Sequence, residues 1–261
     1  MKQSAFDQLP NQSLAKALQI LDVFSMIKPE WGIRELGREL GINPTTIYRL
    51  VTTLHEAGYL ERNVETKAFS LGPKVMKLAG LYSHFNPLPN LAYKIFESYS
   101  SRFGYNYYLG SLVHYEVIYL AVFDGQGPIK IVVEPGGSAA IHTTALGKVL
   151  LAFQPDEFIH KYLEDSQLKV YTSRSISDPG TLWEQIYEIR EKKYAINDGE
   201  YYEEVGSVGV PIHDPKGHVI LSVSLAYPRH LIEDNRLQLD ELITIANEVA
   251  REIEVRMGNA H

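Results

Sequence analysis

The chain of 261 residues contains no cysteine, which excludes disulfide bonds, cysteine-based metal sites and thiol nucleophiles. No apolar run approaches the roughly 18 residues that span a bilayer, since the longest, at 145–153, is interrupted by Gly147 and Lys148. The opening residues, MKQSAFDQLPNQS, lack the apolar stretch of a signal peptide. With 45% hydrophobic and 22% charged residues, the composition is that of a globular protein. These features predict a soluble cytoplasmic protein with no membrane partner.

Positive charge is scarce overall, but it is unevenly placed. The formal net charge is -7. Residues 1–77 hold 10 Lys and Arg against 8 Asp and Glu, whereas residues 78–261 hold 15 against 24. A DNA-binding module needs only a local basic face, so the negative total does not exclude one near the start of the chain.

Two amphipathic helices are predicted in residues 13–41. Ser13 is expected to cap the first helix, because serine oxygens accept hydrogen bonds from the first free N–H groups. A second helix covers 33–40 and ends at Gly41, since glycine adopts the left-handed backbone found after helices. The apolar stripe of the first helix is expected to face inward and consists of Leu14, Leu18, Leu21 and Phe24.

A third helix is predicted from Asn43, its cap, with Pro44 at the first helical position, where a missing N–H costs nothing. Its core side should hold the residues at i, i+3, i+4 and i+7, which are Ile47, Leu50, Val51 and Leu54. The other side carries hydroxyls, a ring and a guanidinium, which suit phosphates and base edges: Thr45, Thr46, Tyr48, Arg49 and Thr52. A solvated helix face is the alternative interpretation.

Two short strands follow the third helix. YLER and KAFSL are separated by a polar turn at 63–66, which indicates a hairpin. Arg62 and Lys67 flank this turn, and we expect them to contact the DNA backbone. Cap, turn, helix and hairpin in this order are typical of a winged helix-turn-helix, so the order favours DNA binding over the solvated face.

The rest of the chain predicts a second, mixed domain. A linker helix at 73–87 is expected to join a DNA-binding domain at 1–72 to a domain at 88–261. In the second domain helices are expected near 88–103, 144–153, 155–164, 181–193 and 234–257, and strands near 105–113, 116–123, 129–134, 205–213 and 218–226. Consecutive strands with short turns predict an antiparallel sheet covered by helices, an α+β fold.

Part of this domain has the features of a ligand site. Ser222 and Ser224 are two residues apart in the strand HVILSVSLAY, so they share one side of the sheet. Their hydroxyls could bind one small polar ligand or form a solvent-facing row, and the pattern leaves both open. The segment 143–147 enters a helix, whose free N–H groups could hold a carboxylate.

Motifs of enzymes are missing. The segment Gly206–Gly209 is not the G-x-S-x-G turn of serine hydrolases, and Leu146–Lys148 lacks the rest of a P-loop. Glu200, Glu203 and Glu204 could ligate a metal, but no histidine cluster accompanies them, and a solvated acidic loop is the preferred interpretation. We therefore predict no catalytic residue, no metal and no cofactor.

Several blocks of the chain resemble one family. SLAKALQILDVF, IRELGRELGINPTTIYRLVTTLHEAGYLER and FSLGPKV look like the amino-terminal half of the isocitrate lyase regulator (IclR) family of bacterial transcription factors. IHTTALGKVLLAF, YAINDGE and VGSVGVPIHDPKGHVILSVSLAYP are similar to blocks of its second half, so the match covers about 13–255. The resemblance implies a winged helix-turn-helix and a profilin-like, GAF-related sensing domain, in dimers or tetramers on palindromic operators.

The resemblance also implies an effector site. On the matching positions its contacts fall to Ala145, Leu146, Asn197, Ser207, Ser222 and Ser224. Asn197 and Ser207 stand where the family commonly has an aspartate and a cysteine. The matched positions include no Arg or Lys, so backbone N–H groups and hydroxyls, with His142 as a further candidate, would hold an anion. Since Asn197 removes a negative charge, a small carboxylate effector is expected.

The sequence therefore predicts a ligand-responsive regulator that binds an operator in double-stranded DNA. It should self-associate through its first helix and through the linker helix, whose apolar face is formed by Val75, Leu78, Ala79 and Tyr82. One alternative is a small-molecule enzyme with an appended winged helix, which turnover of a bound ligand would reveal. Another is a ligand-blind architectural DNA binder, which a ligand-induced change in melting temperature would exclude.

Overall fold

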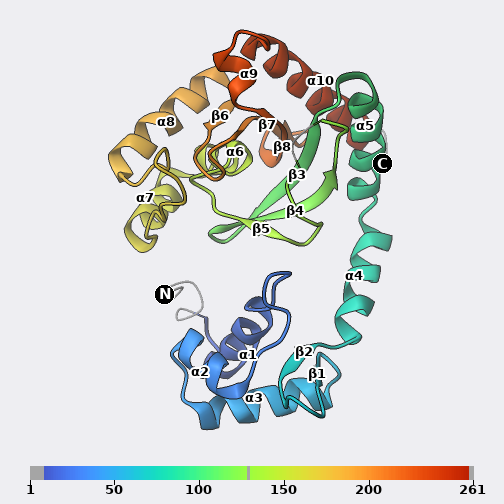
Figure 1. The fold of residues 1–261 in the computed structure, drawn as a ribbon, viewed down its shortest axis with the longest axis vertical. Coiled ribbons are helices and arrows are strands. Elements are labelled where there is room, and N and C mark those ends of the chain that lie inside the picture. The colour runs from blue at the N-terminus through green and yellow to red at the C-terminus, as the bar shows by residue number, and fades with distance from the viewer. Residues whose placement is uncertain (1–8, 128–129, 259–261) are drawn as a thin grey trace. The chain divides into compact units, whose positions relative to one another are not determined.

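The computed structural model describes residues 9–127 and 130–258, and contacts within the chain separate two compact units, 1–86 and 87–261. The first unit is mainly helical and contains one two-stranded antiparallel hairpin. Its elements are α1 (Gln12–Asp22), α2 (Ile33–Leu40), α3 (Pro44–Glu56), β1 (Leu60–Arg62), β2 (Phe69–Leu71) and α4 (Lys74–Phe85) (Figure 1). This is the predicted order of three helices, a wing and a further helix.

The core of the first unit confirms α2 and α3 and corrects α1. Leu36, Ile47 and Val51 are completely buried, as their spacing predicts. In α1 the fully buried residues are Ala15 and Ile20. Of the expected inward face, Leu21 and Phe24 pack against the core as predicted, and the first half was wrong. The two leucines at its start are instead exposed, Leu14 by 57% and Leu18 by 41%. The cap is Asn11 rather than Ser13, because the Asn11 side-chain oxygen accepts from the Leu14 N–H at 3.1 Å.

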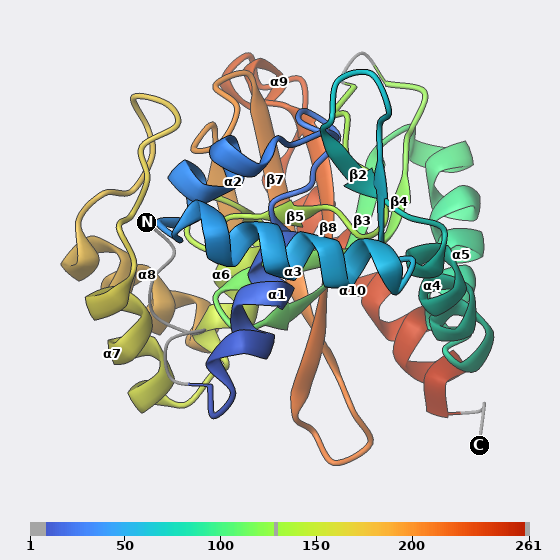
Figure 2. The same ribbon diagram turned by 90° about the horizontal axis from the view of Figure 1, so that it is seen from below.

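The second unit is built on a six-stranded antiparallel sheet in the order β5-β4-β3-β8-β7-β6. Figure 2 shows β7 and β8 extending beyond the other strands as a long hairpin. The strands are β3 (Asn106–Val113), β4 (Glu116–Phe123), β5 (Ser138–Ala139), β6 (Ala195–Asp198), β7 (Val205–His213) and β8 (Val219–Pro228). The helices are α5 (Leu88–Phe103), α6 (Ala145–Ala152), α7 (Asp156–Asp165), α8 (Pro179–Lys192), α9 (His230–Glu233) and α10 (Leu239–Gly258).

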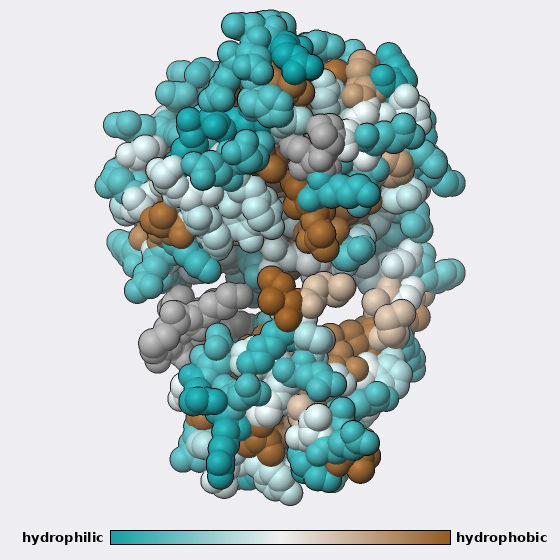
Figure 3. Space-filling model, viewed as in Figure 1, coloured by the Kyte–Doolittle hydropathy of each residue, from teal (hydrophilic) through white to brown (hydrophobic). Residues whose placement is uncertain are grey.

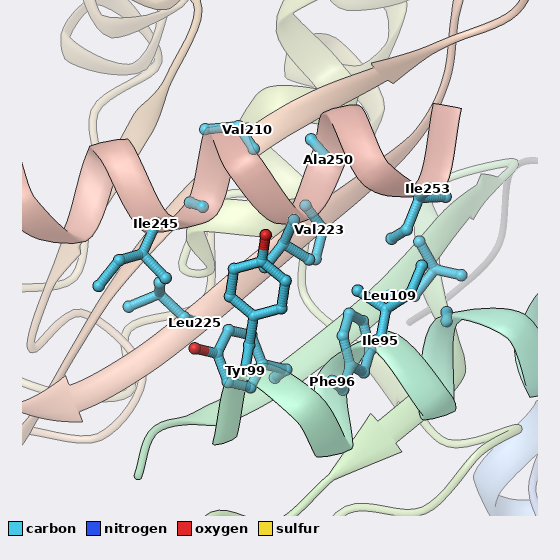
Figure 4. Close-up of a cluster of buried hydrophobic side chains, with 14 of the residues drawn as sticks. Ile95, Phe96, Tyr99, Leu109, Val210, Val223, Leu225, Ile245, Ala250 and Ile253 are labelled. Carbon is cyan, nitrogen blue, oxygen red and sulfur yellow. The ribbon is translucent and has the colours of Figure 1, made fainter. Parts of the chain in front are cut away.

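Helices cover both faces of this sheet, and each face has its own apolar core. On one face α5 and α10 pack against β3, β7 and β8, with Phe96, Leu109, Val223 and Ile253 among the buried side chains (Figure 4). On the other face lies α6, with α8 against it. This arrangement of helices on both faces of an antiparallel sheet confirms the predicted α+β fold. One sheet serves both cores because alternate residues of a strand face opposite sides.

Four local predictions differ from the structure. No strand is present at 130–134, and residue 129 of the expected strand at 129–134 lies outside the described part. The short strand at this edge is β5, further along the chain, where Ser138 and Ala139 pair with β4, and Val132 is 87% exposed. The strand β6 and the helix α9 were not predicted, and α10 begins at Leu239 rather than 234. Asn235 has a left-handed backbone, with φ of 56°, which separates α9 from α10.

The face of the molecule shown in Figure 3 is mostly hydrophilic. On the face shown in Figure 3, hydrophobic residues lie in separate small patches between hydrophilic ones. Across residues 9–127 and 130–258, every helix is too short or too polar to cross a lipid bilayer.

Candidate functional site

The start of α3 is shaped by local sequence. Gly41 ends α2 with φ of 65°, the left-handed conformation that glycine adopts without steric cost. The Asn43 side-chain oxygen accepts from the Thr45 N–H at 2.8 Å, and Pro44 occupies the first turn. All three features were predicted, and they leave the positive end of α3 at the protein surface.

One side of α3 is available for contact. Arg49 and Thr45 are exposed, Tyr48 is 55% exposed, and Thr46 and Thr52 are partly exposed. The Thr52 hydroxyl donates to the Tyr48 carbonyl at 2.8 Å, so its oxygen remains able to accept another hydrogen bond. The structure thus presents the five predicted residues together, while their contact with DNA stays a prediction.

The hairpin places its two basic residues differently. Arg62 is exposed at the end of β1, with its guanidinium 5.7 Å from the centre of the Phe69 ring. Lys67 has a φ of 61°, and its ammonium group donates to the Val64 carbonyl within the turn. Lys67 is exposed and its ammonium group has three N–H donors, so two remain for a phosphate while the third holds the turn.

Of the residues predicted to bind an effector, Ala145 and Leu146 begin α6, and the other four lie on the face of the sheet that packs against α6, called here the α6-facing side. Asn197 on β6 pairs with Ser207 on β7, and Ser224 on β8 pairs with Gly209. Ser222 lies two residues before Ser224 on the same side. All of the polar residues in this group are buried, because α6 and its neighbours cover them. The solvent-facing row that the sequence left open was wrong.

Small residues let the first turn of α6 approach the sheet closely. A Cβ atom at Gly209 would lie 2.7 Å from the Ala145 carbonyl carbon and 3.0 Å from the Leu146 nitrogen. A Cβ atom at Gly110 on β3 would lie 2.6 Å from the Leu146 side chain. Thr144 caps the helix, because its hydroxyl oxygen accepts from the Gly147 N–H at 3.1 Å. The predicted N–H groups therefore sit directly against the serine-bearing strands.

Two of these polar groups already have partners. The Ser222 hydroxyl donates to the Val210 carbonyl at 2.9 Å, so it can accept but not donate to a further group. The Asn197 side-chain oxygen accepts from the Glu200 N–H at 2.8 Å, which leaves its NH2 group as the part able to meet a ligand. Of the two serines on β8, only Ser224 can donate to a ligand as the structure stands.

A buried cation lies behind this site, and the sequence analysis missed it. Lys148 is only 1% exposed, and its ammonium group contacts the Glu200 carboxylate at 2.6 Å and the Gln185 amide oxygen at 3.0 Å. Burial lowers the pKa of Lys148 and raises the pKa of Glu200, while each charge opposes the shift of the other. The second carboxylate oxygen of Glu200 is buried and has no hydrogen-bond partner among the described residues.

The position of Glu200 corrects the expected solvated acidic loop. Gly199, with φ of 76°, turns the chain after β6 so that Glu200 points under α6, whereas Glu203 and Glu204 remain exposed. The described residues contain no group of histidines and carboxylates arranged to hold a metal ion. The lysine was visible in the sequence beside Gly147, but only the fold shows that it is buried.

Aromatic residues that the sequence analysis did not select adjoin the same side. Tyr108 pairs with Ser224 across β3 and β8, and its ring centre lies 5.7 Å from that of Tyr119. Burial raises the pKa of both phenols, so they remain neutral. The Tyr108 hydroxyl is buried and has no hydrogen-bond partner in the described part of the chain. It is therefore a further donor that a ligand could use.

His142 cannot serve as the positive group considered from the sequence. It is buried, with Nδ1 3.2 Å from the Tyr162 hydroxyl and Nε2 3.0 Å from the Lys169 carbonyl. Burial lowers its pKa, so the ring is neutral near physiological pH. Both ring nitrogens are occupied, which makes His142 a structural residue that joins the loop after α7 to the segment before α6.

Two protein-family models match the chain. The model described as the IclR helix-turn-helix domain matches residues 13–64, and the model described as the bacterial transcriptional regulator IclR C-terminal matches residues 82–255. The second match alone covers more than half of the chain. Together they follow the two units that the structure separates.

Relatives of known role agree with these matches. The transcriptional regulator KdgR of Escherichia coli is 26% identical over 260 residues, covering 99% of this chain and 98% of KdgR. XynR, another regulator of E. coli, is 27% identical over 226 residues, covering 87% of this chain and 90% of its own. Both are described as HTH-type transcriptional regulators, and neither is an enzyme.

Solved structures share the fold. A putative IclR regulator from Silicibacter sp. TM1040 superposes with a TM-score of 0.80 at 26% identity, over 93% of this chain and 96% of that one. An IclR homolog from Microbacterium hydrocarbonoxydans, solved with 4-hydroxybenzoate, gives a TM-score of 0.76 at 22% identity, over 95% of this chain and all of that one. The second likeness shows the fold alone.

Proposed function

Since the chain belongs to the IclR family of bacterial transcriptional regulators, we propose that it binds a palindromic operator as a dimer or tetramer and that a small carboxylate controls this binding. In this proposal residues 1–72 bind DNA, 73–87 form a linker helix and 88–261 bind the effector, in the cytoplasm. The relatives are regulators rather than enzymes, which removes the enzyme with an appended winged helix from consideration.

The exposed side of α3 supports the DNA-binding part of the proposal. Replacing Arg49 with alanine should weaken operator binding by about 1–3 kcal/mol, because a direct arginine contact contributes that much to recognition. The fold should be unaffected, since Arg49 is exposed. An electrophoretic mobility shift with a promoter fragment measures the effect, with Arg251→Ala, at an exposed position of α10, as the control. Unchanged affinity across a salt titration would remove Arg49 from the interface.

Self-association is proposed because one winged helix contacts too few base pairs to select a site among roughly 10⁶ competitors. A two-fold dimer doubles the contacts and requires a palindrome. The helix α4 has no buried residue in the isolated chain, although it carries several apolar side chains. These are exposed to between 45% and 78% and comprise Met76, Leu78, Leu81, Tyr82 and Phe85. Such a surface is typical of a contact between protein chains.

We therefore expect a dimer or tetramer in light scattering at micromolar concentration. Leu78→Glu should shift the protein toward monomer, because it places a charge on the apolar side of α4. Lys77→Glu, which changes an exposed neighbour on the same helix, is the matched control and should leave the mass unchanged. A wild type that stays monomeric with and without DNA would contradict the proposal.

The effector proposal depends on one observation, the cluster of donor groups on the α6-facing side of the sheet. Ser207, Ser224 and the Asn197 NH2 group lie there beside the first turn of α6. Donors in excess of acceptors favour an anion, and a helix N-terminus adds favourable N–H groups and a positive dipole end. The Microbacterium homolog was solved with 4-hydroxybenzoate, also a small carboxylate, so that compound belongs in the test.

A panel of small aliphatic and aromatic acids in a thermal-shift assay tests this proposal directly. A ligand at 100 times its dissociation constant adds about 2.7 kcal/mol to stability. The double variant Ser222→Ala with Ser224→Ala should then bind the selected acid at least tenfold more weakly, mainly through the loss of the Ser224 donor. Calorimetry measures the affinity, with exposed Ser101→Ala on α5 as the control.

Two outcomes would contradict the effector proposal. Wild-type affinity in the double variant would place the ligand elsewhere, and a preference for neutral or cationic compounds would exclude a carboxylate. Operator binding without ligand should be the same in both proteins, because the serines and α3 lie in separate units.

A further inference from the structure

The turn after β6 is held in place from several directions. Thr172 donates its hydroxyl hydrogen to the Gly199 carbonyl at 2.7 Å, and Ser175 donates to the Glu200 carbonyl at 2.6 Å. On the other side, the Glu200 carboxylate contacts the Lys148 ammonium group at 2.6 Å. Lys148 belongs to α6, so this ion pair joins the turn to the helix whose first residues form part of the proposed site.

Lys148 itself has little freedom to move. It is buried, and it also donates to the Gln185 side-chain oxygen on α8 at 3.0 Å. A buried ammonium group that left these partners would become an unpaired charge in a low-dielectric environment, which is strongly unfavourable. The pair therefore fixes the distance between α6 and residue 200 rather than adding a loose surface contact.

The fixed position of residue 200 determines how Asn197 is oriented. A side-chain amide has one oxygen that accepts and one NH2 group that donates. The Glu200 backbone N–H can only donate, and it lies 2.8 Å from the Asn197 oxygen. The amide oxygen therefore points to the turn, and the NH2 group is presented on the α6-facing side, opposite Ser207.

We propose that Glu200, held by Lys148, is a positioning residue that orients Asn197 so that its NH2 group selects a ligand carboxylate. This inference rests on the proposed function, because it assumes that the ligand lies on the α6-facing side of the sheet. Asn197 then determines the sign of the interaction: as an amide it donates to an anion, and as an aspartate it would have no hydrogen to donate and would repel the same group. Glu200 acts only through Asn197 and does not touch the ligand.

Asn197→Asp tests whether the Asn197 NH2 group selects a ligand carboxylate. An aspartate oxygen can still accept from the Glu200 N–H, so the fold should persist, while the group facing the ligand becomes an anionic acceptor. Calorimetry should compare two matched pairs, pyruvate with hydroxyacetone and benzoate with benzyl alcohol. We expect the preference for the acid over its alcohol to fall at least tenfold. Asn90→Asp, the same change at an exposed position of α5, should leave it unchanged.

The role of Glu200 is tested by making Asn197→Asp in a protein that lacks the Lys148–Glu200 ion pair. Lys148→Met with Glu200→Leu removes both charges together and keeps an apolar side chain at each position. In that protein Asn197→Asp should change the acid preference by less than threefold. Glu200→Gln can still accept from Lys148, so it should restore the tenfold effect, which a purely structural role would not predict. Hydrogen exchange of the backbone N–H of residue 200 should be slow in Glu200→Gln. It should be faster in the protein with both Lys148→Met and Glu200→Leu.

The outcomes separate the inference from the proposed function. If the wild type binds no acid of the thermal-shift panel, the carboxylate proposal fails and the inference fails with it. If the wild type binds an acid but Asn197→Asp leaves the preference unchanged, only the inference is overturned. If Asn197→Asp has the same effect with and without the Lys148–Glu200 pair, Asn197 selects the ligand alone and Glu200 is not a positioning residue.

Discussion

Lys148→Met should lower the free energy of unfolding of the second unit by about 3–5 kcal/mol, because it leaves the buried Glu200 carboxylate without its cation. The two groups are 2.6 Å apart and both are buried, so solvent cannot replace the missing partner. One Glu200 oxygen already has no hydrogen-bond partner among the described residues, which leaves little local compensation. Removing both charges, in Lys148→Met with Glu200→Leu, should recover most of the loss.

The loss of unfolding free energy caused by Lys148→Met should depend on pH in a defined direction. Burial raises the pKa of Glu200, and Lys148 opposes that shift in the wild type. Without Lys148 the pKa in the folded state lies further above the unfolded value, so the folded state takes up a proton more readily. Stability is then fully present at low pH and is lost as the pH rises through the raised pKa. The difference in unfolding free energy between the wild type and Lys148→Met should therefore become smaller as the pH is lowered from neutral.

Urea unfolding measures both effects. The chain has two tryptophans, Trp31 in the first unit and Trp183 in the second, so fluorescence in a Trp31→Phe background follows the second unit alone. Lys192→Met is the control, since its ion pair with Glu188 is exposed and such pairs contribute little. A loss of unfolding free energy below about 1 kcal/mol for Lys148→Met would show that the ion pair is not effectively buried. A loss that does not change with pH would show the same.

Gly209→Ala should displace α6 from the sheet and abolish effector binding. The added methyl group would lie 2.7 Å from the Ala145 carbonyl carbon and 3.0 Å from the Leu146 nitrogen. These are backbone atoms, which cannot rotate away as a flexible side chain can, so the helix itself must move. Overpacking of this kind costs about 1–3 kcal/mol. The same movement takes the first N–H groups of α6 away from Ser224, which should weaken binding of the selected acid at least tenfold.

Gly258→Ala is the matched control for this change. It makes the same substitution at the end of α10, where a Cβ atom would meet nothing within 4 Å. It should leave stability unchanged or slightly higher, since alanine favours a helix more than glycine does. Urea unfolding and calorimetry with the acid from the thermal-shift panel measure the two effects. Normal ligand affinity in Gly209→Ala would mean that the first turn of α6 does not form part of the site.

Operator binding by the free protein separates these variants from a general loss of folding. Residue 209 lies in the second unit, and the core of the first unit is complete in itself around Leu36, Ile47 and Val51. A Gly209→Ala protein that still binds DNA but no longer responds to the acid would show that α6 is needed for sensing. Loss of both functions would instead indicate that the second unit is required for assembly on the operator.

Signals within a few residues were sufficient for the DNA-binding helix. Asn43, Pro44 and Gly41 each act on the backbone within one helical turn, so their effect is the same in any fold. The i, i+3, i+4 spacing of Ile47 and Val51 likewise defines a single buried side of α3. In α1 the same method placed Leu21 and Phe24 correctly but not Leu14 and Leu18. Apolar residues on two sides of this helix offer alternative inner faces, and only packing against its neighbours selects between them.

The sequence alone determined the order of helices and strands around the wing, the sharing of one sheet side by Ser222 and Ser224, and the family resemblance, because these depend on periods and blocks of adjacent residues. Only the tertiary structure decided that α6 covers those serines, that Gly209 lies against Ala145, and that Lys148 meets Glu200. The two partners of that ion pair are 52 positions apart. Burial and pairing at such separations depend on which elements pack together, and no local pattern contains that information.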